Sequence, residues 1–173
     1  MLRYHDHEWG RPQHDDGMHF EYLVLDAFQA GLSWRTILYK RENFRKAFSG
    51  FDPKKIIRYN GKKLKSLMQD AGIIRNHLKI WGTVKNARAF LQVQKEFGSF
   101  DKYIWQFTSH RTVQNRWKTL KDIPAKTKES DAMSMELKKR GFTFVGSTIC
   151  YAYMQAAGLV NDHLARCDLN KNG

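Results

Sequence analysis

The chain has 173 residues, and its 30 Lys and Arg against 17 Asp and Glu give a formal net charge of +13. This length suits one domain that buries its core without disulfide bonds, and no run of apolar residues is long enough for a transmembrane helix. The two cysteines, Cys150 and Cys167, exclude a disulfide framework and fit a reducing compartment. Because the N-terminal residues also lack the apolar segment of a secretory signal, we expect a cytoplasmic protein without membrane association. We also expect it to be a monomer.

Apolar residues recur at helical spacing along the whole chain, and no stretch shows sustained alternation. The predicted helices cover residues 18–30, 33–48, 53–57, 62–70, 76–97, a short segment after residue 99, 130–140 and 147–157. Residues 108–127 are expected to form a long irregular connection, and both chain ends are expected to lack secondary structure. The sequence therefore predicts a single all-α domain over residues 1–173.

The charge is distributed unevenly along the chain. Residues 1–34 carry a net charge of −4, residues 35–65 carry +9, residues 66–140 carry +8, and the remainder is neutral. Clustered positive charge favours binding to a polyanion, because each neutralised phosphate releases counterions. Nucleic acid is the favoured partner, and an acidic membrane surface is ranked low because the basic segment has no separate apolar face.

The segment 67–76 predicts a hairpin between two helices. One helix is expected to end at Asp70, a tight turn to form at Gly72 with a positive φ, and the next helix to begin within a few residues. The free N–H groups at the start of that helix, with Arg75 beside them, would bind phosphate. The segment resembles a helix-hairpin-helix motif, which grips the DNA backbone without reading sequence, although an ordinary αα-hairpin has the same pattern. Four lysines flank the hairpin, namely Lys62, Lys63, Lys65 and Lys79.

The acidic N-terminal part is also rich in aromatic residues. Tyr4, Trp9 and Trp34 accompany Asp26, which lies on an apolar helix and is expected to be partly buried. Aromatic faces with a carboxylate suit a flat cationic ligand, whereas a purely structural carboxylate among core aromatics is the alternative. Leu32 follows at a helix end, where it is either an ordinary core residue or an apolar wedge of the kind that base-flipping proteins use.

His163 and Cys167 are four residues apart, so on a helix both would point to one face. Zinc takes such ligands, usually four in a structural site, and two ligands alone make no site. His5, His7 and His14 are candidates for the third and fourth ligands. Cys150 lies in an apolar run and is expected in the core.

Five stretches occur in the order that is typical of one family: 4–10 (YHDHEWG), 29–34 (QAGLSW), 70–75 (DAGIIR), 138–142 (KKRGF), and 144–150 (FVGSTIC) continuing to 158–163 (GLVNDH). Together they make the chain similar to the bacterial DNA-3-methyladenine glycosylase I family over nearly its whole length. The resemblance implies an all-α helix-hairpin-helix DNA glycosylase fold, with the hairpin at about 62–80. It also implies a zinc-stapled terminal region formed by 1–16 and 159–173.

The resemblance implies that the enzyme flips 3-methyladenine out of double-stranded alkylated DNA and releases it by hydrolysis, as a step of base-excision repair. The base-binding positions correspond to Tyr4, Trp9, Trp34 and Asp26, and Asp26 is the catalytic candidate. The expected DNA contacts are Gly31, Leu32, Gly72, Ile74 and Arg75, and the metal ligands are His5, His163 and Cys167. Structural zinc is the only cofactor expected, with no organic cofactor.

Two departures from the family pattern stand out. The family's pocket carboxylate is typically Glu, whereas this chain has the shorter Asp26, and the family's first zinc-binding Cys precedes the position of Tyr4, where this sequence has no Cys. The expected zinc site is therefore incomplete, completed by a residue such as His7, or absent. No lysine occurs at the hairpin turn, which predicts a monofunctional glycosylase without lyase activity. The rival readings are a catalytically degenerate helix-hairpin-helix DNA-binding protein and a zinc-stapled adaptor.

Overall fold

The computed structural model describes residues 2–170, and the chain folds as an assembly of helices around the buried helix α2 (Asp16–Gln29). The longer helices are α3 (Trp34–Ala47), α6 (His77–Phe97), α8 (Lys128–Lys139) and α9 (Ser147–Ala156), and the shorter ones are α1 (Leu2–His7), α4 (Pro53–Ile56), α5 (Gly61–Leu67) and α7 (Phe100–Ile104). Single helical turns occur at η1 (Ser49–Phe51), η2 (Trp105–Thr108), η3 (Leu120–Asp122) and η4 (Asp168–Asn170). The all-α prediction is confirmed for the fold class.

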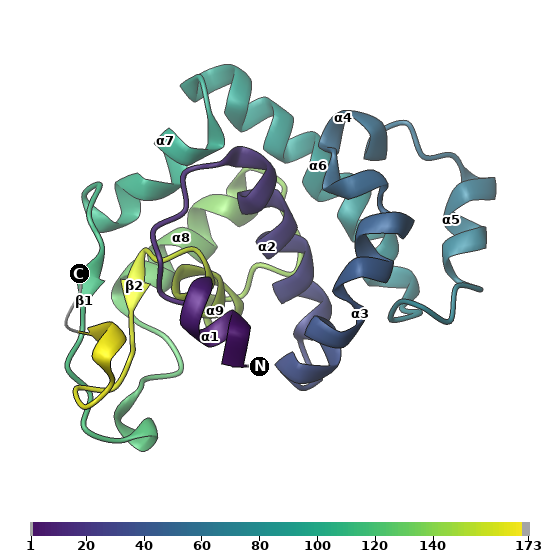
Figure 1. Cartoon of the computed structure of the whole chain (residues 1–173). Helices are drawn as coiled ribbons and strands as arrows, with labels where there is room; N and C mark the ends of the chain where they lie inside the picture. The colour runs from purple at the N-terminus through teal and green to yellow at the C-terminus, as the bar shows by residue number, and fades with distance from the viewer. Residues whose placement is uncertain (1, 171–173) are drawn as a thin grey trace.

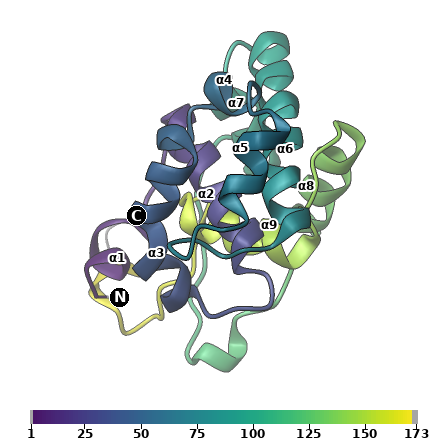
Figure 2. The ribbon, with the colours of Figure 1, turned by 90° about the vertical axis from the view of Figure 1, so that its right-hand side faces the viewer.

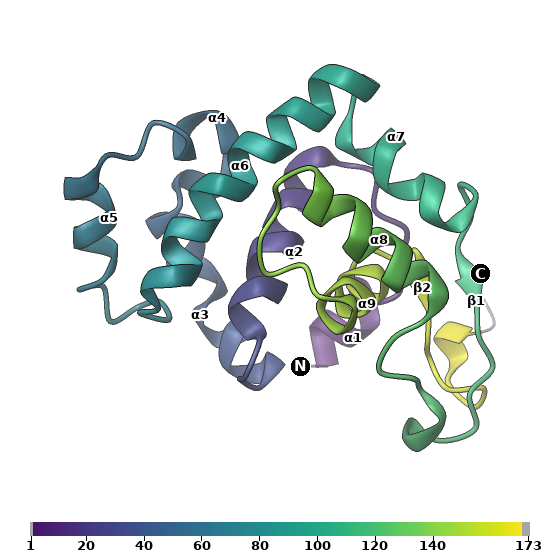
Figure 3. The ribbon, with the colours of Figure 1, turned by 180° about the vertical axis from the view of Figure 1, so that it is seen from behind.

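The helices lie on two sides of α2, and α6 joins the two sides. Figure 1 shows α3, α4 and α5 on one side and α7, α8 and α9 on the other, and Figure 3 shows α6 running diagonally across the back. The apolar stripe of α2 explains its central place, since Phe20, Leu25 and Phe28 are fully buried. Asp15 caps its first turn by accepting a hydrogen bond from the Met18 N–H at 2.9 Å.

Helical spacing predicted the long helices well, because each carries an apolar stripe and all but α9 begin with a side-chain cap. Ser33 caps α3 and Asn76 caps α6, and Gly98 closes α6 in the left-handed conformation. Not every apolar residue of α6 faces the core, since Leu78 on its first turn is 68% exposed. No helix in the described part of the chain is long and apolar enough to cross a membrane.

The two ends of the described chain have more structure than the sequence predicted. Residues 2–7 form α1, and β1 (Val113–Gln114) within the supposedly irregular connection pairs in parallel with β2 (Val160–Asn161). Gly10 makes this junction possible, because a Cβ there would lie 3.0 Å from the His163 ring. The N-terminal backbone therefore packs directly against the C-terminal segment.

Candidate active site

A cavity of about 690 Å³ opens between α1, the end of α2, α9 and the segment 162–167. Its lining brings together residues that are up to 163 positions apart in the sequence: Tyr4, His5, Trp9, Asp26, Gln29, Trp34, Leu120, Ala152, Gln155, Asp162, His163, Leu164, Arg166 and Cys167. The four base-binding candidates named from the sequence all lie in this lining. Such a concave, mostly apolar cavity with a few polar groups is the usual setting of a ligand site.

Asp26 is the polar centre of one half of the cavity. Its side chain is buried, with 2% of the residue exposed, and its Oδ2 atom has no hydrogen-bond partner. Burial raises the pKa of the Asp26 carboxyl well above its usual value, because the charged form loses its hydration. The sequence analysis expected Asp26 to be partly buried. Its nearly complete burial raises the free-energy cost of leaving this oxygen without a hydrogen-bond partner.

Asp162 is a second buried carboxylate in the same cavity, and it shows what a structural carboxylate looks like here. It accepts four hydrogen bonds at 2.6–2.7 Å, from the Asn115 and Gln155 amides, the Trp117 indole and the Tyr151 hydroxyl. These bonds fasten α9 and the 115–117 segment to the C-terminal strand. Asp162 is fully satisfied within the protein, whereas Asp26 keeps an acceptor for a ligand.

Two aromatic rings stand beside Asp26. The rings of Tyr4 and Trp34 have centroids 5.5 Å apart and are tilted by 53°. The Trp34 Nε1–H is buried without an acceptor, so this indole also presents an unused polar group. Burial, followed by the charge of Asp26, raises the pKa of the Tyr4 phenol, which therefore remains a neutral donor. Aromatic faces and unpartnered hydrogen-bonding groups together suit a flat heteroaromatic ligand.

Helix α1 places Tyr4 in the cavity, and a partly buried ion network holds α1. Arg41 of α3 donates to Glu8 at 2.6 Å and to Glu21 of α2 at 2.5 Å, and the Tyr22 hydroxyl donates to Glu8 at 3.3 Å. The sequence analysis missed this role, although Glu8 lies within the 4–10 motif. The network explains why a six-residue helix without an apolar stripe forms at this position.

The segment after α2 projects an apolar side chain from the surface. Gly31 has φ +83° and Leu32 is 39% exposed, which places Leu32 outside the core. The turn is braced from within, since the Gln29 amide donates to the Leu32 carbonyl at 2.9 Å. Lys79 adds a second brace by donating to the carbonyls of Phe28 and Ala30, at 2.9 and 2.7 Å.

The sequence analysis grouped Lys79 with the lysines that flank the hairpin, but its side chain instead points to the end of α2. It is 8% exposed, burial lowers the pKa of its ammonium group, and its Nζ satisfies the C-terminal carbonyls of α2. A lysine on α6 thus fixes the position of the 30–33 turn. In the sequence, the only sign of this role was the position of Lys79 near the start of α6, among the apolar residues of that helix.

The hairpin between α5 and α6 lies beside this turn, as Figure 2 shows. Helix α5 ends at Leu67 rather than at Asp70, and Asp70 accepts the Gly72 N–H at 2.7 Å. Gly72 does not have the expected positive φ; it is needed for space, because a Cβ would lie 2.9 Å from Asp70 Oδ1 and 3.1 Å from Asn43 Cβ. Arg75 is exposed and Ile74 is half-buried at the start of α6.

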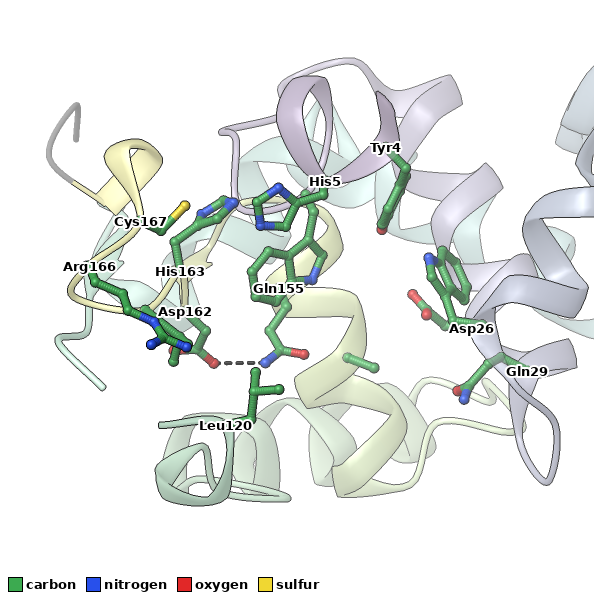
Figure 4. Close-up of a pocket in the computed structure, with 14 residues that line it drawn as sticks. Tyr4, His5, Asp26, Gln29, Leu120, Gln155, Asp162, His163, Arg166 and Cys167 are labelled. Atoms are coloured by element: carbon green, nitrogen blue, oxygen red, sulfur yellow. Dashed lines mark hydrogen bonds between the residues drawn. The ribbon is translucent and has the colours of Figure 1, made fainter. Parts of the chain in front are cut away.

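A metal-ligand group lies at the other end of the cavity. The donor atoms of His5, His163 and Cys167 lie within 4.8 Å of one another, as Figure 4 illustrates. The His163 Nδ1 bonds Asn161 at 2.7 Å, which leaves its buried Nε2 without a partner and directed at the group. This donor set fits zinc, with an outer residue fixing the imidazole as metal sites require.

The other two histidine candidates lie elsewhere. His7 is exposed and lines a separate cavity beside Glu8, and His14 contacts Asp101 at 3.0 Å and stacks on Trp105. Within residues 2–170, the group therefore consists of three ligands. Cys150 is buried as expected, and burial raises the pKa of its thiol to about 12.

Residues 1–171 match the family model described as methyladenine glycosylase. The chain is 49% identical to DNA-3-methyladenine glycosylase 1 of Escherichia coli over 166 residues, an alignment that covers 96% of this chain and 89% of that protein. It is 48% identical to DNA-3-methyladenine glycosylase of Haemophilus influenzae, and that alignment covers 96% of this chain and 90% of the relative. A crystal structure of 3-methyladenine DNA glycosylase I has a TM-score of 0.94 at 46% identity, covering 96% of this chain and 92% of that one. A structure from a study of 3-methyladenine recognition by the Staphylococcus aureus enzyme has a TM-score of 0.95 at 32% identity, covering 99% and 91%. A match over nearly the whole sequence, carried by the same fold, shows that this chain belongs to the methyladenine glycosylase family.

Proposed function

We propose that this protein is a base-excision repair glycosylase that releases 3-methyladenine from alkylated DNA by hydrolysis. The observation that carries the proposal is the buried Asp26 carboxylate, whose Oδ2 lacks a partner beside Tyr4 and Trp34. Methylation at N3 makes the adenine of a nucleotide cationic and weakens its glycosidic bond. The enzyme then needs recognition and electrostatic stabilisation more than strong acid catalysis.

In this proposal the flipped base stacks on Trp34, and Tyr4 and Asp26 hydrogen-bond its edge. The carboxylate favours the cationic base over neutral adenine, because only the cation offsets the cost of keeping Asp26 charged in a buried site. The cavity of about 690 Å³ has room for a purine, and Trp9 forms a further part of its wall. Selectivity thus comes from charge rather than from shape alone.

The DNA duplex is held outside the cavity. Arg75 and the backbone at Gly72 and Ile74 contact phosphates, and Leu32 on the Gly31 turn fills the gap that the flipped nucleotide leaves. Gln29 and Lys79 support this turn from the protein side, which is consistent with a wedge that must keep its position when it is inserted into the duplex.

Hydrolysis without strand cleavage is the expected chemistry. Lyase activity requires a free amine near the sugar, and the cavity lining within the described chain contains no lysine. Lys40 does reach the hairpin, but its Nζ donates to the Ala71 carbonyl at 2.9 Å. Both facts support a monofunctional glycosylase.

The test is incubation of the purified protein with methylated duplex DNA, followed by chromatography of the released bases and gel analysis of the strands. We expect free 3-methyladenine and intact strands. Binding without base release would support the catalytically degenerate DNA-binding protein instead. Strand breaks at the abasic site, formed faster than in a protein-free abasic control, would contradict the monofunctional assignment.

We also propose that His5, His163 and Cys167 hold a structural zinc ion that joins the two ends of the described chain. The buried, unpartnered Nε2 of His163 supports this assignment, because its orientation is already fixed through Asn161. We expect about one zinc ion per chain by mass spectrometry. Cys167→Ser should lose the zinc and lower the melting temperature, and chelation should lower that of the wild type but not of this variant. A metal-free wild type that melts at the same temperature with and without added zinc would contradict the site.

A further inference from the structure

We infer that the turn η3 is a third DNA contact, which grips the duplex on the side of the cavity opposite the Leu32 turn. This inference rests on the proposed function. The strand that it would contact is the continuation of the DNA backbone beyond the flipped nucleotide. The turn η3 has Leu120 at its tip, with Lys118 and Lys121 on either side.

Leu120 lines the same cavity as Asp26, although it is 74% exposed. In Figure 4 it stands across the cavity from Gln29, which braces the Leu32 turn. Leu120 and Gln29, from distant parts of the chain, therefore lie on opposite sides of the cavity. Single exposed leucines are common on protein surfaces, but this one is at the edge of the site.

The exposure of Leu120 is imposed by ordered structure on both sides. The Asp122 carboxylate accepts the Thr119 N–H at 2.8 Å and closes a capping box around η3. On the other flank, the Trp117 indole donates to the buried Asp162 at 2.7 Å, and the Trp117 carbonyl accepts the Ala165 N–H at 2.9 Å. The turn is thus held in place while its apolar tip has no covering partner in the described chain.

The charges around Leu120 complement DNA. Arg116, Lys118, Lys121 and Arg166 are exposed, and none of them makes an ion pair within residues 2–170. The nearest acid in sequence, Asp122, is used in the capping box. An apolar tip surrounded by free cations fits a strand that offers both sugar faces and phosphates.

The placement of η3 also agrees with a continuous DNA-binding face. η3, the short green turn between β1 and α8, lies at the lower edge of Figures 1 and 3, the edge that also carries the loop between α2 and α3. The hairpin between α5 and α6 lies beside that loop. The hairpin, the wedge and η3 therefore follow one another along a single side of the molecule.

The first experiment measures how salt affects the affinity for a duplex that contains a stable abasic analogue. For Lys118→Ala/Lys121→Ala, the slope of log Kd against log salt should become shallower by about one to two, since each phosphate contact contributes about 0.9. Lys95→Ala/Lys102→Ala removes the same charge near the α6–α7 corner, which lies at the opposite edge in Figure 1, and should keep the wild-type slope.

The second experiment measures single-turnover base release by Leu120→Ala. We expect release to slow about tenfold, from loss of an apolar contact made only in the complex. Met135→Ala, at a 54% exposed position on α8, is the control and should match the wild type. Wild-type salt slope and release rate in the η3 variants would overturn the inference. If the wild type binds the duplex but releases no base, the proposed function fails, while the salt slopes still decide the η3 contact.

Discussion

At the scale of single residues, the contrast between Asp26 and Asp162 carries the functional argument. Both are buried carboxylates that line one cavity, yet Asp162 accepts four hydrogen bonds and Asp26 Oδ2 accepts none. Sites that bind charged ligands commonly retain such unsatisfied groups at a cost in stability. Asp26 should therefore lower the stability of the free protein.

Replacing Asp26 by Asn tests that cost. Because the folded state raises the pKa of Asp26, the folded protein binds this proton more tightly than the unfolded chain does. The stability linked to this proton is fully present below the unfolded pKa of about 4 and is lost as the pH rises through the raised folded pKa. The Asn variant avoids this loss, so its melting temperature at about pH 8 should exceed that of the wild type, by about 2–4 °C for each kcal/mol relieved.

Thermal melts of the two proteins at several pH values measure this effect. The difference in melting temperature should narrow toward about pH 5, where the wild-type carboxyl is more fully protonated. A wild type that is as stable as the Asn variant at the higher pH would show that Asp26 is satisfied in the free protein.

At the scale of elements, one lysine braces each of the two turns that are proposed to contact DNA, a buried one at the end of α2 and a partly exposed one at the hairpin. Lys79 of α6 holds the end of α2, and Lys40 of α3 holds the hairpin at Ala71. The Leu32 turn precedes α3 and is held by α6, whereas the hairpin precedes α6 and is held by α3. In the proposed complex, this arrangement would keep the position of the Leu32 wedge fixed relative to the phosphate contacts of the hairpin.

Lys79→Met removes one brace while keeping most of the side-chain volume. We expect nucleotide flipping, followed by 2-aminopurine fluorescence, and base release to weaken about tenfold, because the Leu32 turn loses two hydrogen bonds to its supporting carbonyls. Affinity for undamaged duplex should change less, since the hairpin contacts remain. Lys95→Met on the same helix is the control. If Lys79→Met flips and releases the base at wild-type rates, the brace has no part in positioning the wedge.

At the scale of the whole molecule, the uneven charge has a more specific meaning than the sequence suggested. Most of the acidic residues in 1–34 serve the fold: Glu8 and Glu21 pair with Arg41, and Asp15 and Asp16 cap helices. Only Asp26 presents a buried oxygen without a partner among them. The acidity of this part is therefore mainly structural, and Asp26 is the one carboxylate of the six that we propose binds the ligand.

The sequence predicted the parts of the fold that depend on local signals. Apolar periodicity identified α2, α3, α6, α8 and α9, and side-chain caps marked the starts of the first four. The helical spacing of His163 and Cys167 was the wrong reason to pair them, because residues 163–167 form no helix, although the loop there brings both donor atoms close to that of His5. Helix α1 was missed because its stability comes from contacts of Tyr4 and Glu8 with distant helices. The braces by Lys79 and the exposed tip at Leu120 depend on tertiary packing, which no local pattern records.

The most direct test of the account compares single-turnover release of 3-methyladenine from methylated duplex by the wild type, Asp26→Asn and Asp26→Glu. We predict that Asn slows release about 100-fold or more while duplex affinity stays nearly unchanged, because the charge that matches the cationic base is lost. Asp26→Glu should retain most of the activity, because it keeps the charge and the cavity has room for one more methylene. Release by Asp26→Asn at the wild-type rate would contradict the assignment of Asp26 as the group that recognises the base.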